Sequence, residues 1–152
     1  MLPNLIRIGL LLISWSTLFF IPKKTLKTYT PVAIFASILL VIESILAVPF
    51  KWWTVKGGLL HKFFNDFSFI FGPFFVGTIL FFRFTFRKFW LYAITNLLMD
   101  LFLAFPVSWL SQKLNVFKLV NFKPKHIFYT AIIYAIVIYG FQNFITRSKI
   151  RR

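Results

Sequence analysis

The chain contains no cysteine, and it is poor in acidic residues and histidine. The absence of cysteine excludes disulfide bonds, thiolate metal sites and cysteine nucleophiles. Only three acidic residues and two histidines occur among 152 residues, so a metal site or a catalytic triad would use nearly all of them. The sequence also lacks a phosphate-binding glycine loop, a zinc-protease motif and a nucleophile-elbow motif. It therefore predicts no enzyme activity, no metal site and no other cofactor.

Apolar side chains and basic side chains dominate what the sequence does contain. Hydrophobic residues make up 59% of the chain, against about 45–50% in soluble domains, and the mean hydropathy is +0.81. The 18 basic residues give a formal net charge of +15. Because these cations flank apolar runs instead of covering a domain surface, the sequence does not favour nucleic-acid binding.

Five apolar stretches are long enough to cross a lipid bilayer as helices. They cover residues 5–21, 31–50, 63–82, 89–110 and 127–146. A helix needs about 20 mostly apolar residues to cross a hydrocarbon core of roughly 30 Å. These stretches are apolar on every face, whereas β-barrel strands alternate. We therefore expect an all-α integral membrane protein, in which residues 1–152 form one bundle of five transmembrane helices with an uncleaved first helix.

Prolines and tryptophans mark the ends of these stretches. The prolines at predicted ends are Pro22, Pro31, Pro49 and Pro124. Proline lacks an N–H and clashes with the preceding turn, so it does least harm at a helix end. The tryptophans that we expect to anchor helices at the membrane surface are Trp52, Trp53, Trp90 and Trp109. In residues 111–126, apolar side chains at every third position indicate a short interfacial helix, and a plain loop is the alternative.

The basic residues indicate an orientation. With the N-terminus outside, the inner ten are Lys23, Lys24, Lys27, Arg83, Arg87, Lys88, Arg147, Lys149, Arg151 and Arg152. The outer eight are Arg7, Lys51, Lys56, Lys62, Lys113, Lys118, Lys123 and Lys125. Cytoplasmic loops are enriched in Lys and Arg, so the sequence favours a cell-membrane protein with its N-terminus outside and its C-terminus inside. The basic C-terminus would then lie on anionic lipids, at about 1 kcal/mol per cation.

All three acidic residues, Glu43, Asp66 and Asp100, lie inside predicted spans. An ionisable group there costs roughly 2.5–3.5 kcal/mol and normally faces the interior of the bundle. At about 1.5 Å per residue, Asp100 lies near the midplane, Glu43 roughly 4 Å from it and Asp66 roughly 10 Å from it. Since Glu43 and Asp66 are displaced toward the same face, the three carboxyl groups would form a ladder from one interface to the centre.

The neighbours of these acids support inward-facing positions. Glu43 lies in a strip of mostly small residues that follows one helix face: Ala33, Ala36, Leu40, Glu43 and Ala47, with Ser37 and Ser44 beside it. Asn96 is four residues before Asp100, so its amide can reach that carboxyl. Gly72 and Pro73 predict a kink in the middle of the third span.

Each acid has more than one interpretation. Asp66, which follows Asn65, either caps a helix that begins there or contacts Arg7, whose predicted depth on the first span is the same. Glu43 and Asp100 either join helices as uncharged carboxylic acids, move an ion or proton, or contact a partner protein. The intramembrane candidates for a site are therefore Arg7, Glu43, Asp66, Asn96 and Asp100.

Four short motifs carry a resemblance: Asn65-Asp66, Phe71-Gly72-Pro73-Phe74, the spacing of Tyr92, Asn96 and Asp100, and Tyr139-Gly140-Phe141-Gln142. Between residues 23 and 142 the chain resembles small multi-spanning membrane proteins of low-GC Gram-positive bacteria, whose function is not established. The resemblance implies a membrane location and assigns no role.

Two functions follow from these observations. The first is an accessory or scaffold protein that acts through helix contacts in the bilayer, as a homo-oligomer or with a membrane protein partner. The second is a proton- or cation-coupled carrier or channel component that uses the intramembrane carboxyl groups. Five spans are too few for an inverted-repeat carrier in one chain, so the second function requires an assembly. A lipid-modifying enzyme and a membrane-permeabilising protein are further alternatives.

Overall fold

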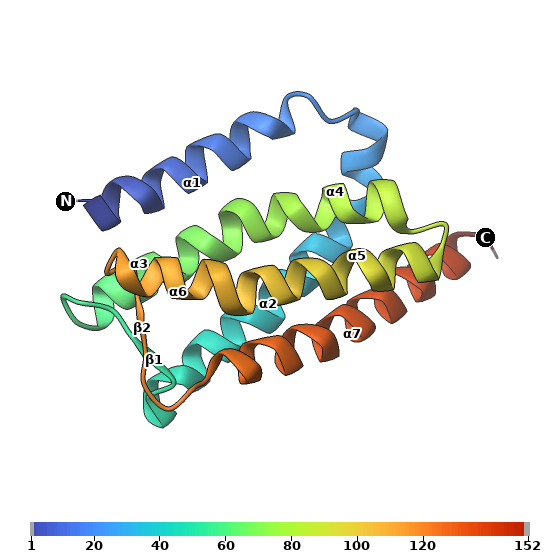
Figure 1. Cartoon of the computed structure of the whole chain (residues 1–152). Helices are drawn as coiled ribbons and strands as arrows, with labels where there is room; N and C mark the ends of the chain where they lie inside the picture. The colour runs from blue at the N-terminus through green and yellow to red at the C-terminus, as the bar shows by residue number, and fades with distance from the viewer. Residues whose placement is uncertain (1, 151–152) are drawn as a thin grey trace.

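The computed structural model describes residues 2–150, which form five continuous helices and a two-stranded ribbon (Figure 1). Three helices are uninterrupted: α1 (Leu2–Leu18), α2 (Lys23–Phe50) and α7 (Pro124–Ile150). One kinked helix consists of α3 (Leu59–Phe69), η1 (Ile70–Phe74) and α4 (Phe75–Thr85). The other consists of α5 (Phe89–Phe102), η2 (Leu103–Val107) and α6 (Ser108–Lys113). The predicted all-helical architecture is confirmed.

Four of these helices are long and apolar enough to cross a membrane: α2, α3–α4, α5–α6 and α7. The first helix is shorter, because it ends at Leu18 and the predicted span to residue 21 continues as a turn. Its 17 residues correspond to about 26 Å of helix, slightly less than the roughly 30 Å of a hydrocarbon core.

The helix ends differ from the predicted ends most clearly in α2. It begins at Lys23, directly after Pro22, so Pro31 lies inside the helix and Pro49 in its last turn. The prediction that Pro31 marks a helix end is therefore wrong, whereas Pro49 lies next to the end of the helix, as predicted. A single proline removes only one intrahelical hydrogen bond, and the first turns of α2 are held by Tyr29, whose ring packs against Phe82 and Phe86.

Four helices form a closed ring and α1 lies outside it. Within the ring, α2 packs against α4 and α7, and α5 packs against the same two helices. Helix α1 packs from outside along α3, η1 and α4 (Figure 1). One end of the bundle, here called the C-terminal end, holds the last turn of α7 and the α1–α2 and α4–α5 connections. The opposite end, called the ribbon end, holds the first turn of α1 and the two strands.

The apolar core lies toward the C-terminal end of the ring, and all four ring helices contribute to it. Its buried residues are Val32 and Ala36 from α2, Phe82 from α4, Tyr92 from α5 and Ile138 from α7. The hydroxyl of Tyr92 donates a hydrogen bond of 2.8 Å to the backbone oxygen of Ala135. An aromatic ring with a satisfied polar end thus fills the centre of this half of the bundle.

Both kinked helices contain a π-helical turn at a proline. The kink predicted at Gly72 and Pro73 is confirmed as η1, whereas the turn at Pro106, η2, was not predicted. Helix α1 docks on the first kink, where the indole N–H of Trp15 donates a 2.8 Å hydrogen bond to the backbone oxygen of Phe71. A Cβ on Gly72 would lie 3.4 Å from the backbone oxygen of Leu10, so the two helices approach closely here.

The ribbon connects the two loops at its end of the bundle. Strands β1 (Trp53–Thr54) and β2 (Lys118–Leu119) are antiparallel, with Trp53 opposite Leu119 and Thr54 opposite Lys118. The alternative of an interfacial helix in residues 111–126 is therefore wrong. Backbone bonding across the two connections explains the difference, because the amide of Val120 donates to the oxygen of Trp52 at 2.9 Å.

Candidate functional site

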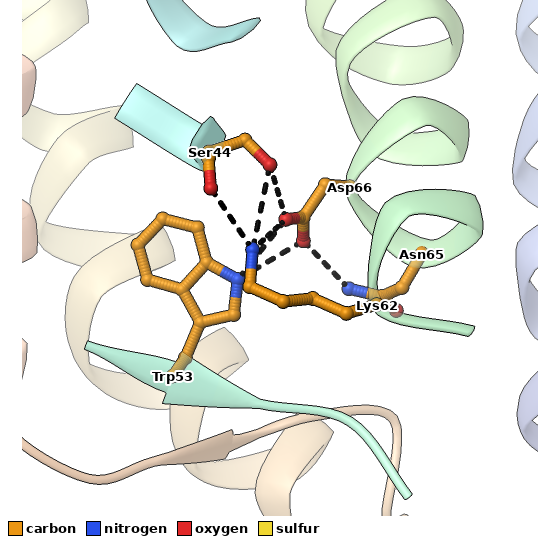
Figure 2. A network of polar contacts seen from close by, with 5 residues as sticks. All are labelled: Ser44, Trp53, Lys62, Asn65 and Asp66. Carbon is orange, nitrogen blue, oxygen red and sulfur yellow. Dashed lines mark hydrogen bonds and ion pairs between the residues drawn. The ribbon is translucent and has the colours of Figure 1, made fainter. Parts of the chain in front are cut away.

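Six polar side chains form one hydrogen-bonded network at the ribbon end, here called the ribbon-end cluster (Figure 2 shows five of them). Its members are Arg7, Ser44, Trp53, Lys62, Asn65 and Asp66. They come from α1, α2, β1 and α3. All except Trp53 are buried. The cluster is thus the place where segments distant in sequence are joined by directional contacts.

Asp66 is the centre of the cluster and accepts hydrogen bonds from four side chains. One carboxylate oxygen, Oδ2, lies 2.7 Å from Lys62 Nζ and 2.5 Å from Ser44 Oγ. The other, Oδ1, accepts from the indole N–H of Trp53 at 3.0 Å and from the amide of Asn65 at 3.3 Å. Both oxygens are therefore satisfied within the protein, as a buried carboxylate requires.

Lys62 and Asp66 form a buried ion pair, with side-chain exposures of 5% and 8%. They lie four residues apart on α3, which places them on the same helix face. The ammonium also donates to the backbone oxygen of Ser44 at 3.1 Å and lies 4.8 Å from the centre of the Trp53 ring. These additional contacts offset part of the cost of removing two charges from water.

Arg7 joins the cluster through Asn65 and not through Asp66. Its Nε donates to Asn65 Oδ1 at 3.0 Å, and its Nη2 donates to the backbone oxygen of Val116 at 2.9 Å. Nη1 donates to Asn4 Oδ1 at 2.7 Å. The predicted contact between Arg7 and Asp66 is therefore wrong in its partner, although the Asn65 amide connects the two charged groups.

The interpretation of Asp66 as a helix cap is also wrong. Helix α3 begins at Leu59 with Gly58 at its N-cap position, so Asp66 is an interior residue. The two glycines before the helix, Gly57 and Gly58, have φ values of 107° and 91°. Residues with side chains rarely adopt these values, so the turn and the helix start are set by glycine.

Glu43 lies beside the cluster and faces the ring interior. The strip predicted on its helix face is confirmed, because Ala33, Ala36 and Ala47 are buried with it in α2. The hydroxyl of Tyr134 in α7 faces its carboxyl group. Glu43 thus faces α7, while its neighbour Ser44 donates a hydrogen bond to Asp66 and connects α2 to α3.

Asp100 and Asn96 do not join the other candidates. Asp100 is 9% exposed, and its Oδ2 is buried without a hydrogen-bond partner among the described residues. The amide of Asn96 donates to the backbone oxygen of Tyr92 at 2.8 Å, so the predicted bond to Asp100 is not formed. Hydrogen bonds among the described residues therefore do not join the three acids: Asp66 belongs to the ribbon-end cluster, and the Oδ2 of Asp100 has no partner.

The cluster contains one pair of groups known from hydrolases, a serine hydroxyl 3.5 Å from a lysine amine, Ser44 and Lys62. In Ser-Lys enzymes the amine serves as the base. Here Asp66 pairs with Lys62 and also accepts a hydrogen bond from the hydroxyl of Ser44, whose exposure is 4%. This arrangement is that of a structural ion pair. Among residues 2–150, no three His, Asp or Glu side chains are grouped as a metal site would need.

Sequence reasoning missed three members of the cluster. The prediction places Lys62 in a loop because the predicted third span begins at residue 63, four residues after the observed start of α3 at Leu59, although the spacing of Lys62 and Asp66 indicates a pair. Trp53 is predicted only as an interfacial anchor, and its indole N–H donates to Asp66. Ser44 was noted only as a small residue. No local signal connects Trp53 or Ser44 to α3, because the contact arises from tertiary packing.

Comparisons of the chain with protein-family models, with curated proteins and with solved structures find no match. The functional argument therefore depends on the residues and their geometry.

Proposed function

We propose that this chain is a multi-pass protein of the cell membrane that acts as an accessory or scaffold protein through helix contacts in the bilayer. Its N-terminus lies outside and its C-terminus inside. It works as a homo-oligomer or with a membrane protein partner, in contact with anionic lipids, and without enzyme activity, a cofactor or nucleic acid.

The observation that carries this proposal is the apolar outer surface of the ring. In the apolar 18-residue stretch of α5–α6, and in that of α7, only 11% of the residues are buried, against 39% in the corresponding stretch of α2. Large apolar side chains face outward along α5 and α7, for example Leu98 at 63% exposure and Ile136 at 63%. Such a surface is stable only against lipid tails or against other apolar helices.

The ribbon-end cluster supports a structural role for most of the intramembrane polar groups. Arg7, Lys62 and Asp66 bond to protein groups in several directions, so their charges serve helix association. In membranes such side chains join helices because water is absent.

The burial of two cations also supports the orientation. Arg7 and Lys62 were counted among the outer basic residues, and both are buried in contacts. Six exposed lysines are left at the ribbon end: Lys51, Lys56, Lys113, Lys118, Lys123 and Lys125. At the C-terminal end, eight basic residues are exposed within residues 2–150. Arg151 and Arg152, also counted as inner, lie outside the described residues. Within residues 2–150 the sequence places eight basic residues at each end, and the exposed ones number eight against six, in the direction of the positive-inside rule.

Asp100 favours a second candidate function, a proton- or cation-coupled carrier or channel component. Its buried Oδ2 has no partner among the described residues. A π-helical turn with Pro106 begins three residues later, and such turns leave backbone groups unpaired and are frequent at functional sites. This candidate depends on Asp100 and not on Asp66.

Two measurements distinguish these functions. Purification in mild detergent followed by mass-resolved sizing is expected to yield an oligomer or a complex with a second membrane protein. In proteoliposomes, the scaffold proposal predicts the same pH-dependent ion flux for the natural chain, Asp100→Asn and empty vesicles. A flux through the natural chain that is lost in Asp100→Asn, but kept in the matched variant Asn96→Ala, would overturn the scaffold proposal in favour of a carrier assembly.

A further inference from the structure

A cavity of about 260 Å³ lies beside the ribbon, separate from the ribbon-end cluster. It is lined by Thr54, Val55, Lys56, Asn115, Phe117 and Lys118. The strand β1 contributes to both places: Trp53 turns into the cluster and Thr54 lines the cavity. Successive side chains of a strand point to opposite faces, so this division follows from the backbone.

The lining of the cavity is suited to an anion. Lys56 and Lys118 are both exposed, and none of the six lining residues is acidic. Thr54 and Asn115 add a hydroxyl and an amide that can donate to oxygen atoms. Asp66, the acid that β1 contacts on its other face, is already engaged by Lys62. Ammonium, hydroxyl and amide donors together match the oxygens of a phosphate group.

The walls of the cavity are fixed by the fold. Thr54 lies opposite Lys118 in the ribbon, which holds the two sides at a set distance. Asn115 adopts a φ of 58°, a conformation in which Asn is enriched. Next to it, the Val116 carbonyl accepts the hydrogen bond from Arg7 at 2.9 Å. Arg7 therefore holds the backbone next to Asn115 in place, and its guanidinium adds a positive charge beside the cavity.

The position of the cavity favours a lipid as the source of the phosphate. It is formed by the loops that follow α2 and α6, at one end of the membrane-crossing helices. The exposed Trp109, in the short helix α6 that precedes the second of these loops, is of the type found at head-group level. Phe117 adds an apolar wall that suits the glycerol and upper acyl region of a lipid.

We propose that the cavity formed by Lys56, Lys118, Thr54 and Asn115 binds the phosphate group of an anionic lipid. This inference rests on the proposed membrane function. The site lies at the ribbon end and is thus distinct from any attraction of lipids to the basic C-terminal tail.

The test is native mass spectrometry of the purified chain in neutral detergent with added phosphatidylglycerol. We expect Lys56→Gln/Lys118→Gln to weaken phosphatidylglycerol binding at least tenfold. The matched control Lys123→Gln/Lys125→Gln removes the same charge from the same end outside the cavity, and it should change binding less than twofold. Equal losses in both double variants would overturn the proposal in favour of diffuse attraction. Circular dichroism checks that each variant keeps its helices.

A second arm distinguishes the source of the phosphate. Inorganic phosphate and glycerol phosphate are titrated into the same detergent sample, and we expect each to bind at least tenfold more weakly than phosphatidylglycerol. Equal binding would overturn the lipid assignment. Release of the protein from membranes by alkaline carbonate would contradict the proposed membrane function alone, because the titration in detergent tests the cavity without a bilayer.

Discussion

Two aspartates of this chain show how surroundings decide the role of a buried residue. Asp66 and Asp100 are about equally buried, at 8% and 9% exposure. Asp66 accepts hydrogen bonds from four side chains, including the ammonium of Lys62. Asp100 has a buried oxygen without a partner among the described residues. The first carboxyl group therefore holds helices together, whereas the second is free for a different use.

The ion pair predicts a large and coupled effect on stability. Lys62→Met leaves the Asp66 charge buried without its cation, and Asp66→Asn leaves the ammonium without its anion. Each is expected to lower the free energy of unfolding by about 3–5 kcal/mol, and the double variant should cost clearly less than the sum. Unfolding in detergent, followed by tryptophan fluorescence, measures all three. Lys56→Met, at an exposed lysine, is the control, and additive costs would contradict the pair.

Asp100 predicts the opposite behaviour. Replacing an unpartnered buried carboxyl group by an apolar side chain breaks no hydrogen bond and removes a desolvation cost. Asp100→Leu should therefore leave the free energy of unfolding unchanged or raise it by about 1 kcal/mol, while Asp66→Leu lowers it. The same unfolding measurement compares the two. A loss in Asp100→Leu as large as that in Asp66→Leu would show that the Asp100 carboxyl group has a partner.

At this scale the sequence predicted which residues are unusual but not their partners. An acid in an apolar stretch is conspicuous, so Glu43, Asp66 and Asp100 could be chosen and their burial expected. The partner of Arg7 differed by one position, Asn65 in place of Asp66. Depth along a helix gives a level in the membrane, whereas the rotation of each helix, which decides the contact, is set by packing.

At the scale of elements, the kink in η1 is the place where α1 is attached. Proline leaves carbonyl groups in its own helix without an amide partner. The indole of Trp15 donates to one carbonyl of this region, that of Phe71, and its ring stacks on Phe75. The docking of α1 thus depends on an irregularity in its neighbour.

This contact predicts a modest loss of stability in Trp15→Phe. The variant keeps an aromatic ring against Phe75 and removes the donor to the Phe71 carbonyl. We expect a decrease of about 1 kcal/mol in the free energy of unfolding, typical of one hydrogen bond. Trp90→Phe, at a site that is 76% exposed, should change it by less than half as much. Equal effects of the two changes would contradict the role of the hydrogen bond.

Helix positions were predictable to within a few residues, except at the start of α2, where a proline lies inside the helix. The apolar stretches gave five helices, and α5 begins at the predicted residue, Phe89. Helix α2 begins eight residues before the predicted start at Pro31, because this proline is accommodated inside the helix. The ribbon was also missed, since two strands of two residues leave almost no pattern in sequence. Their pairing depends on bringing two distant loops together.

At the scale of the whole molecule, the arrangement of the ends predicts which sites share a side of the membrane. Residue 56 follows β1 and residue 121 follows β2, so both lie at the ribbon end, whereas residue 88 lies in the α4–α5 connection at the C-terminal end. Because the chain has no natural cysteine, single cysteines can be introduced by Lys56→Cys, Asn121→Cys and Lys88→Cys. In intact cells an impermeant thiol reagent should label the first two and not the third.

Two other labelling patterns would contradict different parts of this prediction. Labelling only Lys88→Cys would invert the orientation and leave the four-helix ring in place. Labelling at all three positions would contradict the membrane crossing of the ring helices. Permeabilised cells, in which all three should react, control for cysteines that are present but unreactive.

The attachment of α1 outside the ring has a consequence for how the protein is made. Helix α1 is synthesised first, but the carbonyl that accepts from Arg7 belongs to Val116, 109 residues later. During most of synthesis, therefore, an arginine in the emerging chain lacks one of its final acceptors. The contacts of α1 with Asn65 and Phe71 can therefore form before residue 116 is synthesised, whereas the Val116 acceptor of Arg7 becomes available only when the chain reaches the second strand of the ribbon.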